Sequence, residues 1–314
     1  MKLASSMACG ALALLVSLQT GFAGHRFAAG DSSKKILAIV DADGKIEWSH
    51  PVQAIHDLHV LANGNILFQE NFQNVIEMTP TKRVVWKYQA KAVKDRKKRT
   101  EIHAFQRLEN GLTLIAESGP GRIIEVDGDG KIRKEIKLQI DNPNPHRDTR
   151  LVRKLANGHY LVAHEGDGKV REYDGDGKVV WSYDVPMFGR KAAGGHGPEG
   201  FGNSLFSALR LPNGNTLIGT GNGHGILEVT PEKKIVWELH QKDLPGITLA
   251  WVTQIAALPN GNILIGNCHA GPKNPQLIEV TREKKVVWTF RDFENFGDSF
   301  VNNQLLDVKG DVIR

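Results

Sequence analysis

A short motif, Leu-x-Asn-Gly, recurs along the chain and constrains the fold more than any other feature. Its clearest copy lies in residues 258–266, where Asn-Gly separates two apolar runs. Asn-Gly between alternating apolar residues is the strongest short-range indicator of a two-residue β-hairpin turn, because both central residues then need positive φ. The motif glycines, with that of a degraded last copy, are Gly64, Gly111, Gly158, Gly214, Gly261 and Gly310.

The repeat has the length of a propeller blade. The steps between successive motif glycines are 47, 47, 56, 47 and 49 residues, and a period of about 40 to 50 residues with several strands per unit is typical of β-propellers. After each hairpin comes a short apolar run such as residues 226–229, then a turn, then a run that usually ends in tryptophan, such as residues 235–237. Each repeat therefore predicts a four-stranded antiparallel sheet.

The two ends of the chain complement one another. Residues 35–40 and 45–48 predict a third and a fourth strand with no first pair before them, whereas residues 299–314 predict a first and a second strand with nothing after them. Pairing them in one blade would remove an exposed sheet edge. We therefore predict an all-β fold, a six-bladed β-propeller over residues 34–314 that is closed by its N- and C-terminal strands, with a linker over residues 24–33.

Residues 1–23 predict a secretory signal peptide. Lys2 gives a positive start, residues 7–18 form an apolar run, and residues 21–23 form a small-residue cleavage site. The apolar run is too short for a membrane span, which needs about 20 residues. We expect an exported protein, periplasmic or secreted, that is a monomer and has no membrane span.

The net charge of +5 comes from one segment, since basic residues concentrate in residues 87–99. No basic stripe interleaved with aromatic residues runs along the chain, so nucleic acid is not an expected partner. The expected partners are a small-molecule or anionic ligand, or a protein, bound at the loop-rich face of the propeller.

Repeat columns that stay constant are interpreted as scaffold, and columns that vary are interpreted as candidate function. The tryptophans and the third-strand glutamates are constant, which favours packing between neighbouring sheets. The columns at the start of the first strand and the end of the second strand vary and are polar, and buried polar groups without partners are costly. A polar ring there predicts water, a ligand or an ion at the channel mouth.

Three residues of this ring, from three consecutive repeats, are the candidate catalytic residues: His56, His103 and Arg150. The histidines could act as nucleophile and acid/base while the arginine holds an anion. They could instead bind a divalent metal, with His164, Glu70 and Glu117, or line a wet channel without chemistry. No His-Glu-x-x-His spacing occurs, so no metal ligand is assigned.

The candidate ligand-binding residues come from the same columns and from loops of the same face. The glycine-rich loop over residues 189–202, which accounts for the longest step, is interpreted as a flap over the channel. The full set is Asp57, Glu70, Glu117, His164, His196, Asn222, His224, Thr253, Asn267, His269 and Asn302.

The repeat unit, with Asn-Gly-Asn-Ile-Leu, Ile-Glu-Val-Thr and Lys-Val-Val-Trp, resembles the PQQ-like repeats of quinoprotein-like propellers over nearly the whole mature chain. The His-Asp opening at residues 54–57 also resembles repeats of bacterial arylsulfate sulfotransferases. That resemblance implies a six-bladed propeller with a transiently sulfated channel histidine, helped by further histidines and an arginine, and His56, His103 and Arg150 match in location.

No quinone site and no metal site can be matched, so the cofactor (PQQ, a divalent metal or none) stays open. Two hypotheses of function follow. The first is a ligand- or partner-binding module that uses the loop-rich face and the channel mouth. The second is a group-transfer or hydrolytic enzyme that uses the channel histidines on a small anionic substrate.

Overall fold

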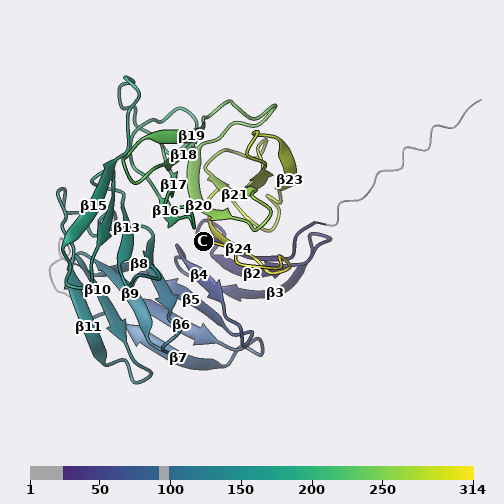
Figure 1. Ribbon diagram of the computed structural model, residues 1–314. Coiled ribbons are helices and arrows are strands. Elements are labelled where there is room, and N and C mark those ends of the chain that lie inside the picture. Colours follow the sequence, from purple (N-terminus) through teal and green to yellow (C-terminus); the bar gives the residue numbers. More distant parts are fainter. Residues whose placement is uncertain (1–23, 92–98) are drawn as a thin grey trace, which may run out of the picture.

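Six four-stranded antiparallel sheets surround one central axis in the computed structural model, which describes residues 24–91 and 99–314 (Figure 1). The predicted signal peptide, residues 1–23, and residues 92–98 of the basic segment lie outside the described residues. All regular elements within the described residues are strands. The all-β prediction and the count of six blades are confirmed.

Five blades are continuous in sequence. Blade 1 contains β4 (Leu58–Val60), β5 (Ile66–Asn71), β6 (Asn74–Met78) and β7 (Val84–Gln89). Blade 2 contains β8 (Glu101–Arg107), β9 (Thr113–Ser118), β10 (Arg122–Val126) and β11 (Ile132–Lys137). Blade 3 contains β12 (Val152–Lys154), β13 (Tyr160–His164), β14 (Lys169–Tyr173) and β15 (Val179–Asp184). Blade 4 contains β16 (Ser207–Arg210), β17 (Thr216–Gly219), β18 (Ile226–Val229) and β19 (Ile235–Leu239). Blade 5 contains β20 (Trp251–Ala257), β21 (Ile263–Cys268), β22 (Leu277–Val280) and β23 (Val286–Phe290).

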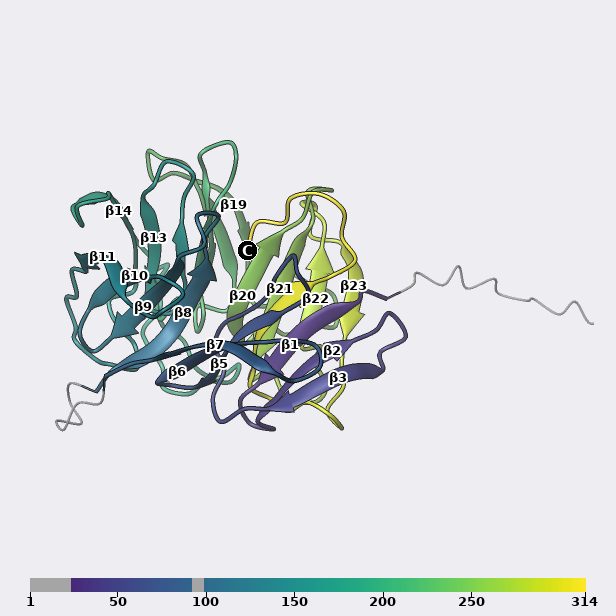
Figure 2. The same ribbon diagram turned by 90° about the horizontal axis from the view of Figure 1, so that it is seen from below.

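The sixth blade joins both ends of the chain, as predicted, but with a different division of strands. Its order is β24 (Phe300–Leu305), β1 (Phe27–Asp31), β2 (Ile36–Val40) and β3 (Ile46–Pro51). The prediction of a linker over residues 24–33 is wrong for β1, which is buried along its length and pairs with β24. Figure 2 shows this sheet beside that of blade 5.

The C-terminal end therefore supplies one strand of the closing sheet instead of two. After β24 the chain makes only an isolated bridge, between Ile313 and Ala257. The sequence did not predict β1 because its pairing with β24 joins the two ends of the chain without a turn, and because the turn to β2 over residues 32–35 lacks the Asn-Gly of the other hairpins. Small residues, Ala28 to Gly30, also weaken its strand pattern.

The repeated Asn-Gly turn is one residue longer than predicted. In blade 1 Leu61 N donates to Asn65 O at 2.8 Å and Gly64 N donates to Leu61 O at 2.8 Å, which leaves three residues in the loop. Gly64 has a φ of 81°, whereas Asn63 is not among the positive-φ residues. This is a type I turn closed by a left-handed glycine, so the glycine is needed for its φ and the asparagine for its side chain, which accepts from Asn65 N at 3.0 Å.

Each constant glutamate holds the next blade. Glu77 of β6 accepts from Arg107 of β8 at 2.6 Å, and the Arg107 guanidinium lies 5.2 Å from the ring centre of Trp86 of blade 1. The same arrangement joins later blades through Glu172, Arg210 and Trp181 and through Glu228, Arg282 and Trp237. Lys154 binds Glu125 between blades 2 and 3, and His25 binds Glu279 between blades 5 and 6. The constant columns are therefore contacts between neighbouring blades.

Closure of the ring can be tested at Gly30 of β1. A Cβ at this position would lie 2.8 Å from Ile55 Cγ2 and 2.9 Å from Asn302 Oδ1, so Gly30→Ala forces two packed elements apart. We expect the free energy of unfolding in urea to fall by about 1–3 kcal/mol, as for other overpacked sites.

Gly128→Ala is the matched control, because a Cβ there meets nothing within 4 Å. It should leave the unfolding midpoint nearly unchanged. Equal stability of the two variants would mean that β1 does not occupy the closed blade in solution.

Candidate functional site

The three candidate catalytic residues meet at one end of the central channel. His56 precedes β4, His103 lies in β8 and Arg150 precedes β12, so each stands at the start of the innermost strand of its blade. His56 Nδ1 lies 2.6 Å from His103 Nδ1. Arg150 Nη1 lies 3.0 Å from His56 Nδ1 and 3.4 Å from His103 Nδ1. All three side chains are buried.

These contacts define which ring nitrogens carry protons. A guanidinium only donates, and Arg150 Nη1 lies nearer to His56 Nδ1, at 3.0 Å, than to His103 Nδ1, at 3.4 Å, so we assign His56 Nδ1 as its acceptor. The 2.6 Å contact then requires a proton on His103 Nδ1. As neutral rings, His56 carries its proton on Nε2 and His103 leaves Nε2 bare.

Both rings are neutral at pH 7 because of burial. Burial lowers the pKa of His56 well below its usual value, and the Arg150 charge and the neighbouring imidazoles act in the same direction. Burial also lowers the pKa of His103 to about 3, and Arg150 adds to this although Glu101 opposes it.

Two arginines share one carboxylate beside the histidines. Glu165 accepts from Arg147 Nε at 2.9 Å and from Arg150 Nε. Arg147 Nη2 also donates to Ser204 Oγ at 2.5 Å. Two guanidiniums therefore stand against one carboxylate, which leaves one positive charge without a counter-charge in this group.

These groups line a cavity of about 530 Å³ at the channel mouth. His56, Arg147, Arg150 and Glu165 lie on one part of its wall. Residues 193–196 of the glycine-rich loop also line it, so this loop borders the mouth. The rest of the wall includes three aromatic rings: Phe72, Phe206 and Trp251.

Four of the predicted ligand-binding residues line the cavity: His196, Asn222, Thr253 and His269. The His196 ring centre lies 4.9 Å from that of Trp251 and 5.3 Å from that of His269, so these rings form one side of the mouth. Asn222 Oδ1 accepts from Ser204 N at 2.9 Å and supports the loop that carries Ser204.

The predicted residues at the ends of the second strands lie away from the cavity. His164 is buried between Asp148 O, 2.7 Å from Nδ1, and the Tyr173 hydroxyl, 2.9 Å from Nε2. Glu117 accepts from the Tyr88 hydroxyl and from Arg122 Nε, both at 2.7 Å. The second strand lies one strand spacing, about 4.8 Å, further from the axis, so these side chains bind within and between sheets.

The remaining predicted residues of the outer loops and channel also do not line the cavity. His224 Nδ1 and Nε2 each lie 2.6 Å from a main-chain carbonyl oxygen, and Asn267 Nδ2 donates to two carbonyls. Glu70 lies in β5, half-buried. Asn302 is buried on β24, and its side-chain nitrogen and oxygen have no hydrogen-bond partner within the part of the chain that the structure describes.

Asp57 lies further along the channel than the cavity, at a level where side chains fill the axis; we call this the closed level. Its carboxylate binds Arg153 through two hydrogen bonds, of 2.8 and 3.0 Å, and accepts from Phe105 N of blade 2 at 3.3 Å. Burial by itself raises the pKa of Asp57, but the Arg153 guanidinium and the His59 ring hold it well below its usual range. Asp57 thus joins three blades.

Arg314 fills the axis at this level. Its guanidinium donates to Leu58 O at 2.6 Å and to Gln304 Oε1 at 2.8 Å, and burial lowers its pKa to about 9. The chain end lies at the centre of the ring in Figure 1. The polar columns that predicted an open channel therefore fill much of it with side chains.

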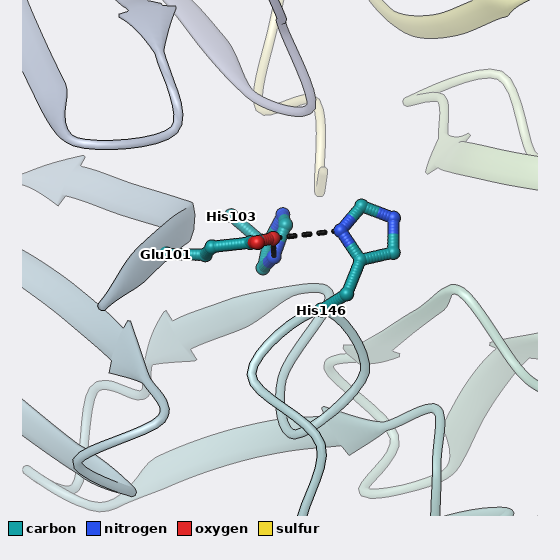
Figure 3. Close-up of side chains that lie close together, drawn as sticks. All are labelled: Glu101, His103 and His146. Atoms are coloured by element: carbon teal, nitrogen blue, oxygen red, sulfur yellow. Dashed lines mark hydrogen bonds and ion pairs between the residues drawn. The ribbon is translucent and has the colours of Figure 1, made fainter. Parts of the chain in front are cut away.

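Sequence reasoning missed Glu101 and His146, which surround His103 (Figure 3). Glu101 Oε2 lies 2.7 Å from His146 Nδ1 and 3.2 Å from His103 Nε2. Glu101 could have been found, because residues i and i+2 of a strand share a face and His103 was already singled out. His146 lies in the loop between β11 and β12, where the sequence carries no comparable pattern.

The geometry of the repeat has a counterpart in known proteins. A family model described as outer membrane protein assembly factor BamB, built on PQQ-type repeats, matches residues 33–290. The chain belongs to this family of PQQ-like propellers. No curated protein matches the chain. Within the described residues no helix is long and apolar enough to cross a membrane.

Solved structures with the same fold include proteins of different roles. A protein of unknown function from Bacteroides caccae is 26% identical with a TM-score of 0.75, over 89% of this chain and 98% of that chain. A streptogramin B lyase is 15% identical with a TM-score of 0.57, over 87% and 85%. An inactive virginiamycin B lyase from Staphylococcus aureus, with quinupristin, is 13% identical with a TM-score of 0.55, over 88% of each chain. The two lyases share the fold alone.

A structural role for Asp57 predicts a defined pH dependence. Asp57→Asn leaves the buried Arg153 without its counter-charge, so the free energy of unfolding at pH 7 should fall by about 3–5 kcal/mol. Because the pKa of Asp57 is lowered by folding, its contribution is fully present above the usual carboxyl pKa of about 3.9 and is lost as the pH falls below it.

Urea unfolding at pH 7 and at pH 3 measures this effect. The difference between wild type and Asp57→Asn should shrink in acid. Asp184→Asn, at a carboxylate that is 74% exposed, is the control and should cost little at either pH. If wild type is no more stable than Asp57→Asn at pH 7, or if the difference in stability grows in acid, Asp57 does not have the proposed structural role.

Proposed function

We propose that this protein is an exported binding module that holds a small organic anion at the channel mouth. The observation that carries the proposal is the set of donors around one cavity: Arg147, Arg150 and His56, with Glu165 as the carboxylate that the two arginines share. An anion in the cavity would accept charge-assisted hydrogen bonds, which are shorter and stronger than neutral ones.

His56 contributes a donor because of its neighbours. Its Nδ1 faces Arg150 and His103, and its Nε2 has no hydrogen-bond partner within the described residues. With the proton on Nε2, the ring offers N–H to a ligand in the cavity that it lines. Since the ring is neutral, this donor persists at pH 7.

The shape of the cavity supports an organic ligand. Its volume of about 530 Å³ falls within the range of small-molecule sites, about 300–1,000 Å³. Phe72, Phe206 and Trp251 provide apolar surface in the same wall, and the Phe206 ring centre lies 5.8 Å from the Arg150 guanidinium. An anion with an aromatic or other apolar body fits both parts of the wall.

Export is part of the proposal and is supported by two observations. Residues 1–23 have the pattern of a secretory signal peptide. The matching family model carries the description of an outer membrane protein assembly factor. These support a periplasmic or extracellular location, and a monomeric propeller is part of the same proposal.

Group transfer by His56 is the second candidate function. It is supported by the contact of His56 with a second histidine, His103, and with Arg150. In that reaction His56 Nε2 would attack a sulfate or phosphate ester, take the sulfuryl or phosphoryl group, and release the phenolate. The attack needs a bare Nε2, which places a proton on Nδ1 against the Arg150 N–H at 3.0 Å. This unfavourable contact is the reason for preferring binding over transfer.

Calorimetric titration with 4-nitrophenyl sulfate at mildly acidic pH tests the proposal, with 4-nitrophenol, which is uncharged at that pH, as the counterpart. We expect the sulfate ester to bind in preference to the phenol. Arg147→Gln removes one charge-assisted hydrogen bond, worth about 1.5–3 kcal/mol, so the Kd should rise at least about 10-fold. Arg147 suits this test because its side chain is 41% exposed and the buried Glu165 keeps Arg150 as its partner without it.

Lys191→Gln, an exposed change on the glycine-rich loop, is the control and should bind like wild type. Equal affinities for the ester and the phenol would contradict an anion site. An intact mass increased by one sulfuryl group, with released phenol, would show that the protein is a transferase.

A further inference from the structure

Three potential metal ligands converge beside the anion cavity. The carboxylate of Glu101, Nε2 of His103 and Nδ1 of His146 all lie within 4.8 Å of one another (Figure 3). Glu101 and His103 are buried in β8, and His146 comes from the loop that leads to β12. Two imidazoles and one carboxylate are a common ligand set for zinc that keeps an open fourth position.

The distances suit one ion. In a tetrahedral zinc site with bonds of about 2.0–2.1 Å, ligand atoms lie about 3.3 Å apart. Glu101 Oε2 lies 3.2 Å from His103 Nε2 and 2.7 Å from His146 Nδ1, so small side-chain shifts would admit the ion.

The independent observation is the unpartnered Nε2 of His103. This side chain is fully buried, and Nε2 makes no hydrogen bond within the described residues, although it lies 3.2 Å from the Glu101 carboxylate. His103 Nδ1 carries the ring proton because of the contact with His56. With the ring proton on Nδ1, a bare nitrogen and a carboxylate oxygen face each other at 3.2 Å, an arrangement that a metal ion between them satisfies, as a proton in a direct hydrogen bond from His103 to Glu101 also would.

We propose that Glu101, His103 and His146 bind a divalent transition-metal ion of the zinc type. His103 binds through Nε2, His146 through Nδ1 and Glu101 through Oε2. The site goes beyond the proposed anion binding and uses different side chains.

The surroundings hold each ligand as metal sites require. Arg99 Nε donates to the other oxygen of Glu101 at 2.5 Å, which orients the carboxylate. His103 Nδ1–H donates to His56, and such partners fix the tautomer of a metal-binding histidine. The Phe72 ring centre lies 5.4 Å from those of both His103 and His146 and provides an apolar cover. Because His146 also lines the cavity, a ligand bound there can reach the ion's open position.

The test uses the full mature chain, stripped with a chelator and then dialysed against Zn²⁺. We expect one zinc per chain by elemental analysis. Co²⁺ in place of zinc should give the intense visible absorption bands of a four-coordinate ion, a result that does not depend on any variant.

His146→Ala removes the ligand that lies on a loop, and it should weaken zinc binding at least about 10-fold in a competition titration with a chromophoric chelator. The matched control is His240→Ala, because His240 also lies 3.3 Å from a carboxylate, that of Glu238, but belongs to no three-residue cluster within the described residues. It should bind zinc like wild type.

Zinc content near zero after dialysis, or equal zinc affinity of His146→Ala and wild type, would overturn the site. Either result leaves the anion site standing, since Arg147, Arg150 and Glu165 are not ligands. Conversely, a protein that binds zinc but shows no preference for the sulfate ester would retain this site and lose the proposed function.

Discussion

A contact from a third-strand glutamate to a basic side chain of the following blade is the interaction on which this propeller depends, and among the described residues it is made at five of the six junctions between blades. Neighbouring sheets otherwise meet through apolar side chains. Apolar contacts are not directional, so they do not fix the height of one sheet relative to the next along the axis. The glutamate of one blade and the arginine of the next are directional, and a tryptophan beneath the arginine limits its position, as for Glu77, Arg107 and Trp86. Because the blades are held at one level, the starts of their inner strands meet, and residues 47 positions apart come into contact.

The central channel has two levels that differ in how fully their polar groups are paired. At the closed level, the Asp57 carboxylate has Arg153, Phe105 N and Leu58 N as partners, and Arg314 fills the axis. At the mouth, His56 Nε2 and His103 Nε2 have no hydrogen-bond partner within the described residues. A completed network stabilises the fold, whereas groups left without partners are available to a ligand. The same polar columns of the repeat therefore serve stability at one level and binding at the other.

Much of the fold could be predicted from the sequence because the same repeat, with the same turn and strand pattern, occurs along the whole propeller. The turn glycines close the first hairpin of blades 1 to 5, and the glutamates of the same five blades contact the following blade. The prediction was wrong for β1 because residues 27–31 pair with a strand at the far end of the chain, and the turn that joins them to β2 lacks the Asn-Gly motif. For the site, counting along the repeat found His56, His103 and Arg150, since the first strand of every blade lines the axis. It could not find His146, Arg147 or Glu165, because irregular loops and side-chain lengths decide what they reach.

Anion binding at the channel mouth and metal binding at His103 both depend on which ring nitrogen of His56 carries the proton. Long-range ¹H–¹⁵N NMR of the histidine rings, recorded at neutral pH on the metal-free protein, distinguishes the two neutral tautomers. The structure predicts that His56 is protonated on Nε2 and His103 on Nδ1, which makes His56 a donor to an anion and leaves His103 Nε2 free for a metal. A His56 protonated on Nδ1, with a bare Nε2 in the cavity, would contradict both assignments and would favour a nucleophilic role.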